Sequence, residues 1–368
     1  MKELTDFLWP KIKLLFVPYI ILMFLLVYRI DFQISAPGGI TEVESLIEVD
    51  YEVDEIEGSI SSTYVISFKR PTIFQFIISD FSPYNNVIIL PDYYAHYTDQ
   101  ESREISYLHK LKSVDASVIV AYENASQNNS DIIFNESDVY KEILIYGKTP
   151  ELNNYDEINL GDEFIQVKLG NDIFLLAEDL YAESDSQFDD YLEDYLIDSM
   201  SEDIVYEFTF KNDDGEYQVN LTKTDIEDNL IFEQNILVDQ TNIFPRFTEN
   251  DSNIGGPSGG LLQTLSIYNM IVEEDITKGL KIAGTGTIRY DGSVGYIGSV
   301  RQKIATAYVN DVDIFFIPAI DEESYSSNIT HNYTEALAAC EEFGIDPEGW
   351  LIPVASFSEA ISYLEGIE

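Results

Sequence analysis

The sequence predicts an α+β (mixed α/β) fold preceded by one transmembrane helix, and three observations lead to this prediction. An apolar run lies near the N-terminus. Short strand-like runs fill the chain up to about residue 222, and helical and strand-like patterns alternate over the last third. Because such alternation is typical of mixed α/β domains, we expect a strand-rich middle part and a C-terminal mixed domain.

The N-terminal run, residues 14–28, is uncharged and almost wholly apolar. It is short for a bilayer, but Lys13 and Arg29 can reach toward the head groups. A signal peptide is disfavoured because proline follows the candidate cleavage site after Ala36, and a buried core helix is rarely apolar on every face. We therefore expect residues 1–31 to be a cytoplasmic N-terminus and transmembrane anchor, with the rest of the chain outside the cytoplasm.

The region 37–222 shows the signals of a strand-rich fold. Two alternating runs within 205–222 flank an Asp-Asp-Gly turn and predict a β-hairpin. Residues 178–203 carry eleven acidic and no basic side chains, with apolar residues at helical spacing, and predict a solvated amphipathic helix. A cation site there would lack the calcium-loop pattern. Apolar runs that predict single strands lie at 63–68, 86–90 and 142–146.

Helices and strands are predicted to alternate after residue 257. The pair Ser356 and Glu359 predicts a capping box at the start of the final helix. A first helix with proline in its first turn is predicted over 257–274. The other predicted elements are a strand at 281–288, a helix at 300–309, a strand at 313–318, a helix at 335–343 and a strand at 350–354.

The net charge of the chain indicates which classes of partner it is unsuited to bind. The chain has 67 acidic and 20 basic residues, a formal net charge of −47. This charge repels nucleic acid and argues against a DNA or RNA partner. Solubility and adaptation to high salt explain it most simply, and a basic partner is the alternative. The single cysteine, Cys340, excludes an internal disulfide, and without a zinc-ligand cluster we predict no metal or cofactor.

A serine stands among glycines in residues 255–260, GGPSGG, at the start of a predicted helix. Glycines let backbone N–H groups approach a substrate carbonyl, and a helix N-terminus adds partial positive charge. We therefore predict that Ser258 is a nucleophile and that Gly256, Pro257 and Gly259 form the backbone loop for an oxyanion. A glycine-rich loop that only caps a helix would give a similar string.

A serine hydroxyl needs a base, and lysine is the better candidate here. Lys303 follows Val300 by three residues and precedes Ala307 by four, which places all three on one helix face. A lysine on an apolar face is desolvated, which lowers its pKa toward the value that a general base needs. The ordinary alternative is a lysine that extends into solvent. The histidines lack a triad context: they are His96, His109 and His331.

Four segments in register carry a family resemblance: GGPSGG at 255–260, IAGTGTI at 282–288, DGSVGYIGSVRQK at 291–303 and DIFFIPA at 313–319. They closely resemble the proteolytic domain of the Lon protease family. In that family the catalytic serine sits in G-P-S-A-G, and the catalytic lysine ends I-G-G-x-x-x-K a little over forty residues later; here the separation is 303 − 258 = 45. The resemblance covers roughly 225–368. It implies a Ser258–Lys303 dyad in which Thr285 positions the lysine.

Two residues depart from the Lon pattern. Gly259 replaces the usual alanine, and Ser299 replaces the second glycine before the lysine helix. Both are small, so we expect the dyad to survive. The Lon ATPase module would need G-x-x-x-x-G-K-[ST], and the partial match at 147–149 lacks the upstream glycine. The resemblance therefore implies an enzyme that works without ATP.

The order of anchor, middle domain and Lon domain resembles the YlbL-like membrane-anchored proteases, whose middle domain is a PDZ domain. Residues 159–165 resemble the PDZ string L-x-x-G-D-x-I, and 206–222 resemble its closing hairpin. The resemblance implies a PDZ-like domain at about 131–222 that captures protein or peptide substrates by strand addition. Because Lon domains tend to form rings, it also implies a homo-oligomer.

The predicted function is thus a membrane-anchored serine endopeptidase that works without ATP, on the outer side of the cell membrane. One alternative is a membrane-tethered peptide-binding or scaffold protein with a degenerate Lon domain. The intact set of Ser258, Lys303 and Thr285 argues against it. A second alternative is an esterase with a Ser–His pair, which no motif supports.

Overall fold

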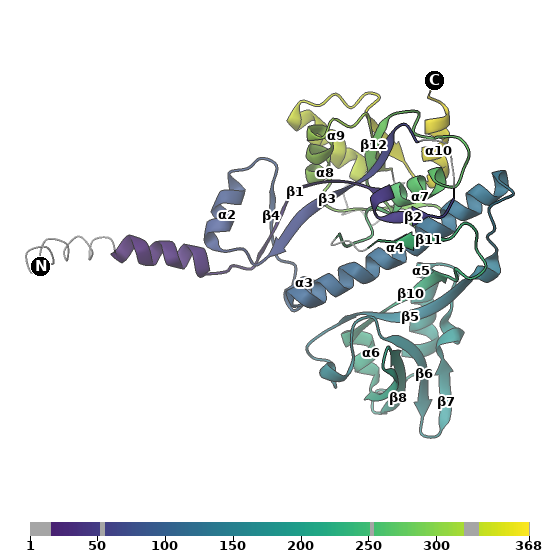
Figure 1. Ribbon diagram of the computed structural model, residues 1–368. Helices are drawn as coiled ribbons and strands as arrows, with labels where there is room; N and C mark the ends of the chain where they lie inside the picture. The colour runs from purple at the N-terminus through teal and green to yellow at the C-terminus, as the bar shows by residue number, and fades with distance from the viewer. Residues whose placement is uncertain (1–15, 52–55, 251–253, 320–330, 368) are drawn as a thin grey trace, which may run out of the picture.

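A computed structural model describes residues 16–51, 56–250, 254–319 and 331–367. This part of the chain is mixed α/β. It contains two large sheets, and one long helix runs between them (Figure 1). We call the part built on the first sheet the main unit, and residues 139–238, which form the second sheet, the inserted unit.

The predicted transmembrane anchor is wrong. Residues 16–27 are helical and project from the main unit (Figure 1). At roughly 1.5 Å per residue they extend about 18 Å, against about 30 Å for the hydrocarbon core of a bilayer. No helix in the described ranges is long and apolar enough to cross a membrane. The single-pass location and the outside placement of the later chain depended on this anchor, and they are corrected with it. Residues 1–15, which include Lys13 and the first two residues of the predicted run, lie outside the described ranges.

The main unit is built on a six-stranded sheet whose order is β16-β15-β12-β3-β1-β4. The strands β3, β12, β15 and β16 run parallel, while β1 pairs antiparallel with β3 and β4. Their bounds are β1 Phe32–Glu42, β3 Ser59–Lys69, β4 Asn86–Ile89, β12 Lys281–Gly284, β15 Ile314–Pro318 and β16 Leu351–Val354. The strand β3 belongs to the predicted region 37–222, and it hydrogen-bonds directly to β12 of the predicted domain 225–368. The two predicted regions therefore share one sheet.

Helices cover this sheet. The helix α7 (Gly260–Asn269) is buried along its whole length, and α8 (Val300–Val309) packs on β1, β3 and α9. Two further helices are α9 (Asn332–Phe343) and α10 (Phe357–Glu365). The remaining elements are η1 Val43–Ser45, β2 Ile47–Val49, α2 Ile73–Asp80, α3 Asp92–Ala95, β11 Phe247–Glu249, β13 Thr287–Ile288 and β14 Val294–Gly295.

The capping box predicted for the final helix is half present at α10. The Ser356 hydroxyl accepts from the N–H of Glu359, as predicted. The Glu359 carboxylate, however, accepts from the N–H of Ala355 instead of that of Ser356. The serine therefore caps the start of the helix, while the glutamate binds the residue before it.

The inserted unit has its own sheet of six strands, with the order β10-β5-β6-β8-β9 and with β7 paired to β6. The predicted hairpin is β8 and β9. A separate apolar core, which includes Ile145, Phe164 and Phe208, fills this unit. Its strands are β5 Val139–Lys148, β6 Glu163–Leu169, β7 Asp172–Leu176, β8 Tyr206–Asn212, β9 Gly215–Leu221 and β10 Leu230–Val238. The short helices in and just before it are η2 Glu136–Asp138, η3 Tyr155–Glu157, η4 Ala177–Leu180, α5 Asp185–Tyr191, η5 Leu192–Ile197 and α6 Lys223–Asn229.

Several predicted elements are shorter in the structure. The predicted helix 257–274 is α7, and it begins only at Gly260. The predicted strand 281–288 is broken into β12 and β13 at Gly286, whose φ is +157°. The acidic stretch 178–203 is divided among η4, α5 and η5 instead of forming one helix. The strands predicted at 63–68, 86–90 and 142–146 lie in β3, β4 and β5.

The long helix α4 (Asp99–Asn128) was not predicted, and it joins the two units (Figure 1). Thr98 and Glu101 form a capping box at its start: the Thr98 hydroxyl accepts from the N–H of Glu101, and the Glu101 carboxylate accepts from the N–H of Thr98. Most of its buried apolar residues, between Val114 and Ala125, belong to the core that also holds α7. The helix therefore belongs to the main unit, although the inserted unit follows it in the sequence.

Candidate active site

Ser258 lies in a turn just before α7, not inside the helix as predicted. Its carbonyl oxygen accepts from the N–H of Gly286 at 2.8 Å and from the hydroxyl of Thr285 at 2.9 Å. Because the loop after β12 uses this carbonyl, Ser258 does not take part in the helical hydrogen-bond pattern. Gly256, with φ at +87°, is in the left-handed region that favours glycine, which turns the chain before the serine.

Lys303 projects from α8 toward this turn. Its Nζ atom donates to Ser258 Oγ at 2.8 Å and to Thr285 Oγ1 at 2.7 Å. As the helical spacing predicts, it lies on the same buried face as Val300 and Ala307, and only 3% of Lys303 is exposed. The structure thus brings together the three side chains that the sequence analysis selected.

Burial lowers the pKa of Lys303 from 10.5 to about 7. Desolvation is the cause, because removing a charged ammonium from water favours its neutral form. At neutral pH a large share of this lysine is therefore unprotonated. A neutral amine has a lone pair, so Lys303 can accept the proton of a neighbouring hydroxyl.

Thr285 fixes the orientation of the lysine. This side chain is fully buried, and its hydroxyl hydrogen is donated to the Ser258 carbonyl. The Thr285 oxygen can then only accept, and it accepts from Lys303. When Lys303 is neutral, Thr285 can still hold one of its N–H groups, and the Ser258 hydroxyl can donate to the amine lone pair instead of accepting from Nζ.

The backbone donors near the serine differ in part from the prediction. The N–H of Gly256 donates to the carbonyl of Ser106 at 2.7 Å, and Pro257 has no N–H. Neither can stabilise an oxyanion in this arrangement. In the described ranges the N–H groups of Ser258 and Gly259 have no hydrogen-bond partner. These two are the backbone donors that can reach a substrate oxygen.

Side chains of α4 hold the turn that contains Ser258, and sequence reasoning missed them. Ser113 donates to the carbonyl of Pro257 at 3.2 Å. Ser117 Oγ lies 3.1 Å from the carbonyl oxygen of Gly260 and 2.7 Å from that of Ser113, and its one hydroxyl hydrogen is shared between the two. Together with the hydrogen bond from Gly256 to Ser106, these contacts hold the serine turn against one face of α4. The capping box before α4 was the signal that could have revealed this helix.

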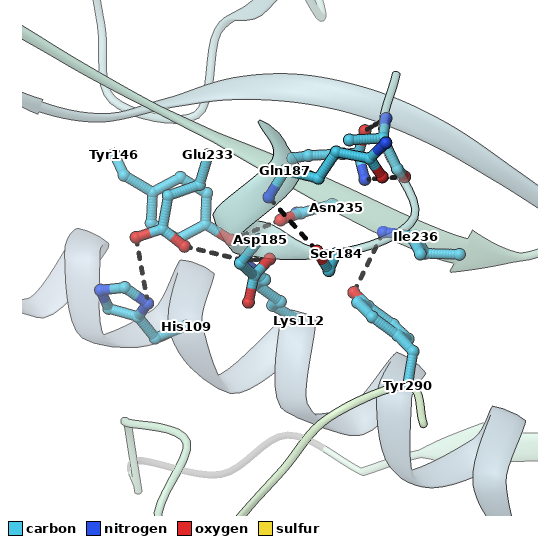
Figure 2. A network of polar contacts seen from close by, with 12 residues as sticks. His109, Lys112, Tyr146, Ser184, Asp185, Gln187, Glu233, Asn235, Ile236 and Tyr290 are labelled. Carbon is cyan, nitrogen blue, oxygen red and sulfur yellow. Dashed lines mark hydrogen bonds and ion pairs between the residues drawn. The ribbon is translucent and has the colours of Figure 1, made fainter. Parts of the chain in front are cut away.

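Other side chains of α4 contact the inserted unit (Figure 2). Lys112 Nζ lies 2.9 Å from a carboxylate oxygen of Glu233 on β10 and 3.1 Å from one of Asp185 on α5. His109 lies 3.9 Å from Glu233, and its ring contacts Tyr146. The hydroxyl of Tyr290, from the main unit, accepts from the N–H of Ile236 at 3.0 Å. One helix thus contacts both the serine turn and β10.

A cavity of about 590 Å³ opens at Ser258. Lys110, from α4, lines it and pairs with Glu249. Among the described residues no histidine lines this cavity. His109 lines an adjacent cavity, while His96 lies just beyond α3 and His331 precedes α9, so the geometry provides no Ser–His pair.

The lysine of the partial phosphate-loop match has a local structural role. Lys148, in the partial phosphate-loop match, is buried and donates to the carbonyls of Tyr155 and Ile158, so it holds a loop of the inserted unit. Within the described ranges no group of three or more His, Cys, Asp or Glu side chains could hold a metal ion. Cys340, on α9, is a buried free thiol in the core that this helix covers.

No model of a known protein family matches this chain, and no curated protein matches it in sequence. The geometry of the site provides a serine hydroxyl, a buried amine whose pKa is lowered to about 7, and two free backbone donors.

Proposed function

We propose that the chain is a serine endopeptidase that works without ATP and uses a Ser258–Lys303 dyad. The observation that carries this proposal is the 2.8 Å contact between Ser258 Oγ and the Nζ atom of a buried lysine whose pKa is lowered to about 7. A solvent-exposed lysine would be protonated at neutral pH and could not act as a base.

The proposed reaction is acyl transfer to the serine. Ser258 Oγ attacks the carbonyl carbon of a peptide bond while its proton moves to Lys303 Nζ. The N–H groups of Ser258 and Gly259 stabilise the oxyanion. The C–N bond then breaks, and the leaving amine takes the proton from Lys303. Water, deprotonated by the same lysine, hydrolyses the acyl-enzyme and regenerates the serine hydroxyl.

The motif resemblance supports the same proposal independently of the geometry. The segments that resemble the Lon proteolytic domain contain Ser258, Thr285 and Lys303 in the family's order. We therefore propose polypeptides as the substrates, since the resemblance is to proteases and the cavity at the serine continues into a second one beside β3.

The inserted unit could present a substrate by strand addition only at an edge of its sheet that is not already paired. The predicted strand addition named no edge of the sheet. In the structure β10 pairs with β5 from Val139 to Lys148, so this edge of β5 is occupied. A peptide could use that edge only after β10 had left it. In the described sheet β9 is the outer strand at the other end. We therefore propose β9 as the edge of the inserted unit at which an extended segment can pair.

The experiment that tests the proposal is capture of the acyl-enzyme. The full-length chain is mixed with an activated peptide ester, quenched in acid and measured by intact-mass and peptide-mapping mass spectrometry. We expect the acyl group on Ser258, and we expect Lys303→Met to reduce its rate of formation by about a hundredfold or more. Acylation at another residue, or equal rates in the Lys303→Met chain, would show that the dyad is not the reacting group.

A further inference from the structure

The cavity at Ser258 is one part of a longer groove between β3 and α4. The strand β3 pairs with β12 only from Ser59 to Ser62, whereas it pairs with β1 through to Lys69. In the described sheet, residues 63–69 therefore have one edge that no strand covers. This edge lines the cavity at Ser258 and then a second cavity of about 870 Å³, which residues 99–109 of α4 line from the other side. Ser67 and Gly256 line both cavities.

The charge of this groove is opposite to that of the whole chain. Among the described residues that line the two cavities, Asp99 is the only carboxylate. The chain as a whole has 67 acidic residues and 20 basic ones. The composition of the groove, in which basic side chains outnumber carboxylates, therefore differs from that of the whole chain. The basic side chains that line the groove are Arg29, Lys69, Arg103, His109, Lys110 and Lys303.

Three of these basic side chains carry a positive charge that no ion pair neutralises. Lys110 pairs with Glu249, Lys303 belongs to the dyad, and His109 lies near Glu233. The other three bind neutral oxygens in the described structure: Lys69 donates to Ser102 Oγ at 2.6 Å and to the carbonyl of Tyr94, Arg103 donates to the carbonyl of Asp99, and Arg29 donates to the carbonyl of Arg70. Within the groove their positive charge is offset only by Asp99 and remains available to a ligand.

A free strand edge and uncompensated cations favour one kind of ligand. The backbone of an extended peptide can pair with alternate N–H and C=O groups of residues 63–69, whatever its sequence. Cations beside that edge attract carboxylates and repel basic side chains. From Ser62, which adjoins Gly259 in the serine turn, to Lys69 the strand covers roughly 23 Å at about 3.3 Å per residue. The cations thus lie several residues from the peptide bond at Ser258.

We propose that this groove binds extended polypeptide segments rich in Asp and Glu, pairing their backbone with residues 63–69 and placing their carboxylates beside Lys69 and Arg103. This substrate class rests on the proposed peptidase function. Single-stranded nucleic acid is the other polyanion that cations attract, but the net charge of −47 opposes its approach.

Fluorescence anisotropy tests the proposal on the full-length Ser258→Ala chain, which binds without cutting. Three labelled peptides of one length, long enough to span the groove, carry Asp and Glu, Asn and Gln, or Lys at the same positions; a labelled single-stranded DNA is the fourth probe. We expect the acidic peptide to bind about five- to tenfold more tightly than the neutral one, and the preference to weaken with added salt.

Charge-removing variants locate the binding. Lys69→Gln and Arg103→Gln should each weaken binding of the acidic peptide by about two- to fivefold while leaving the neutral peptide unchanged. Lys281→Gln is the matched control, because Lys281 is exposed, lies on β12 outside both cavities and has no ion pair in the described structure. Circular dichroism melting confirms that the variants fold.

The proposal is overturned if the three peptides bind equally, if Lys281→Gln weakens binding as much as the groove variants do, or if the DNA binds as tightly as the acidic peptide. Its failure is distinct from failure of the proposed function. If the chain with Ser258 hydrolysed acidic and neutral peptides equally, the groove proposal would be wrong and the peptidase proposal would stand. If acidic peptides bound selectively but no acyl-enzyme formed, the peptidase proposal would be wrong and the groove would still bind acidic peptides.

Discussion

The Nζ atom of Lys303 lies 2.8 Å from Ser258 Oγ, although 45 positions separate the two residues in the sequence. The lysine comes from the first turn of α8, and the serine from the turn that precedes α7. Between them, Thr285 at the end of β12 contacts both the lysine amine and the serine carbonyl. The contact therefore depends on three separate elements packed on one sheet.

Replacement of Lys303 distinguishes a base from a positive charge. Lys303→Arg keeps the charge but cannot lose a proton at accessible pH, and Lys303→Met keeps the length without an amine. Both should lower kcat/KM for peptide hydrolysis by about a hundred- to ten-thousandfold. Steady-state kinetics on a fluorogenic peptide measures this. Substantial activity in the Lys303→Arg chain would contradict a role as general base.

The pH dependence of kcat/KM should report the lysine. A base acts only when it is unprotonated, so activity should be low in acid and rise through the Lys303 pKa of about 7 to a plateau. Below that pH the rate should fall about tenfold per pH unit. Burial also raises the pKa of Glu142 to about 7, but Glu142 lies on β5 in the inserted unit. Glu142→Gln should therefore leave the pH profile unchanged. If the profile shifted in the Glu142→Gln chain, Glu142 and not Lys303 would be the group that titrates.

Thr285→Val should reduce kcat by about ten- to a hundredfold with little change in KM, because the lysine loses the hydroxyl that orients it. Thr285→Ser keeps that hydroxyl and should retain most of the activity. Thr306→Val is the matched control: Thr306 is also a buried threonine, but its hydroxyl donates to Gln302 within α8. Equal losses in the two valine variants would indicate a packing effect instead of positioning.

Gly260→Ala should destabilise the fold. A Cβ atom there would lie 2.7 Å from Ser113 Oγ and 2.9 Å from the backbone nitrogen of Ile288, and a backbone atom cannot move aside easily. We expect a loss of about 1–3 kcal/mol in the free energy of unfolding, measured by denaturant titration. Gly298→Ala is the control, because nothing lies within 4 Å of its Cβ position. Similar losses in both variants would refute this account of the turn.

The proximity of Ser258 and Lys303 could be predicted because its signals are local. The spacing of Lys303 from Val300 and Ala307 determines one face of one helix, and that face is buried in the structure. The glycines around Ser258 likewise report the conformation of one turn. Such features depend on a few neighbouring residues, so a sequence pattern contains most of the information about them.

The surroundings of the dyad could not be predicted in the same way. The pairing of Ser62 with Gly284 joins residues more than two hundred positions apart, and nothing in either strand alone specifies its partner. The contact of Ser113 with Pro257 spans the whole inserted unit. The anchor was predicted at 14–28 from composition alone, which does not determine the length of a helix. The described helix is too short to span a bilayer.

Hydrolysis of an unfolded protein without ATP tests the central claim most directly. The full-length chain and its Ser258→Ala variant are incubated with the same chemically unfolded protein, and new N-termini are identified by mass spectrometry over time. The dyad predicts new internal N-termini with the native chain and none above background with the variant. Equal cleavage by both chains, or no cleavage by a correctly folded native chain at about pH 8, above the lysine pKa, would contradict it.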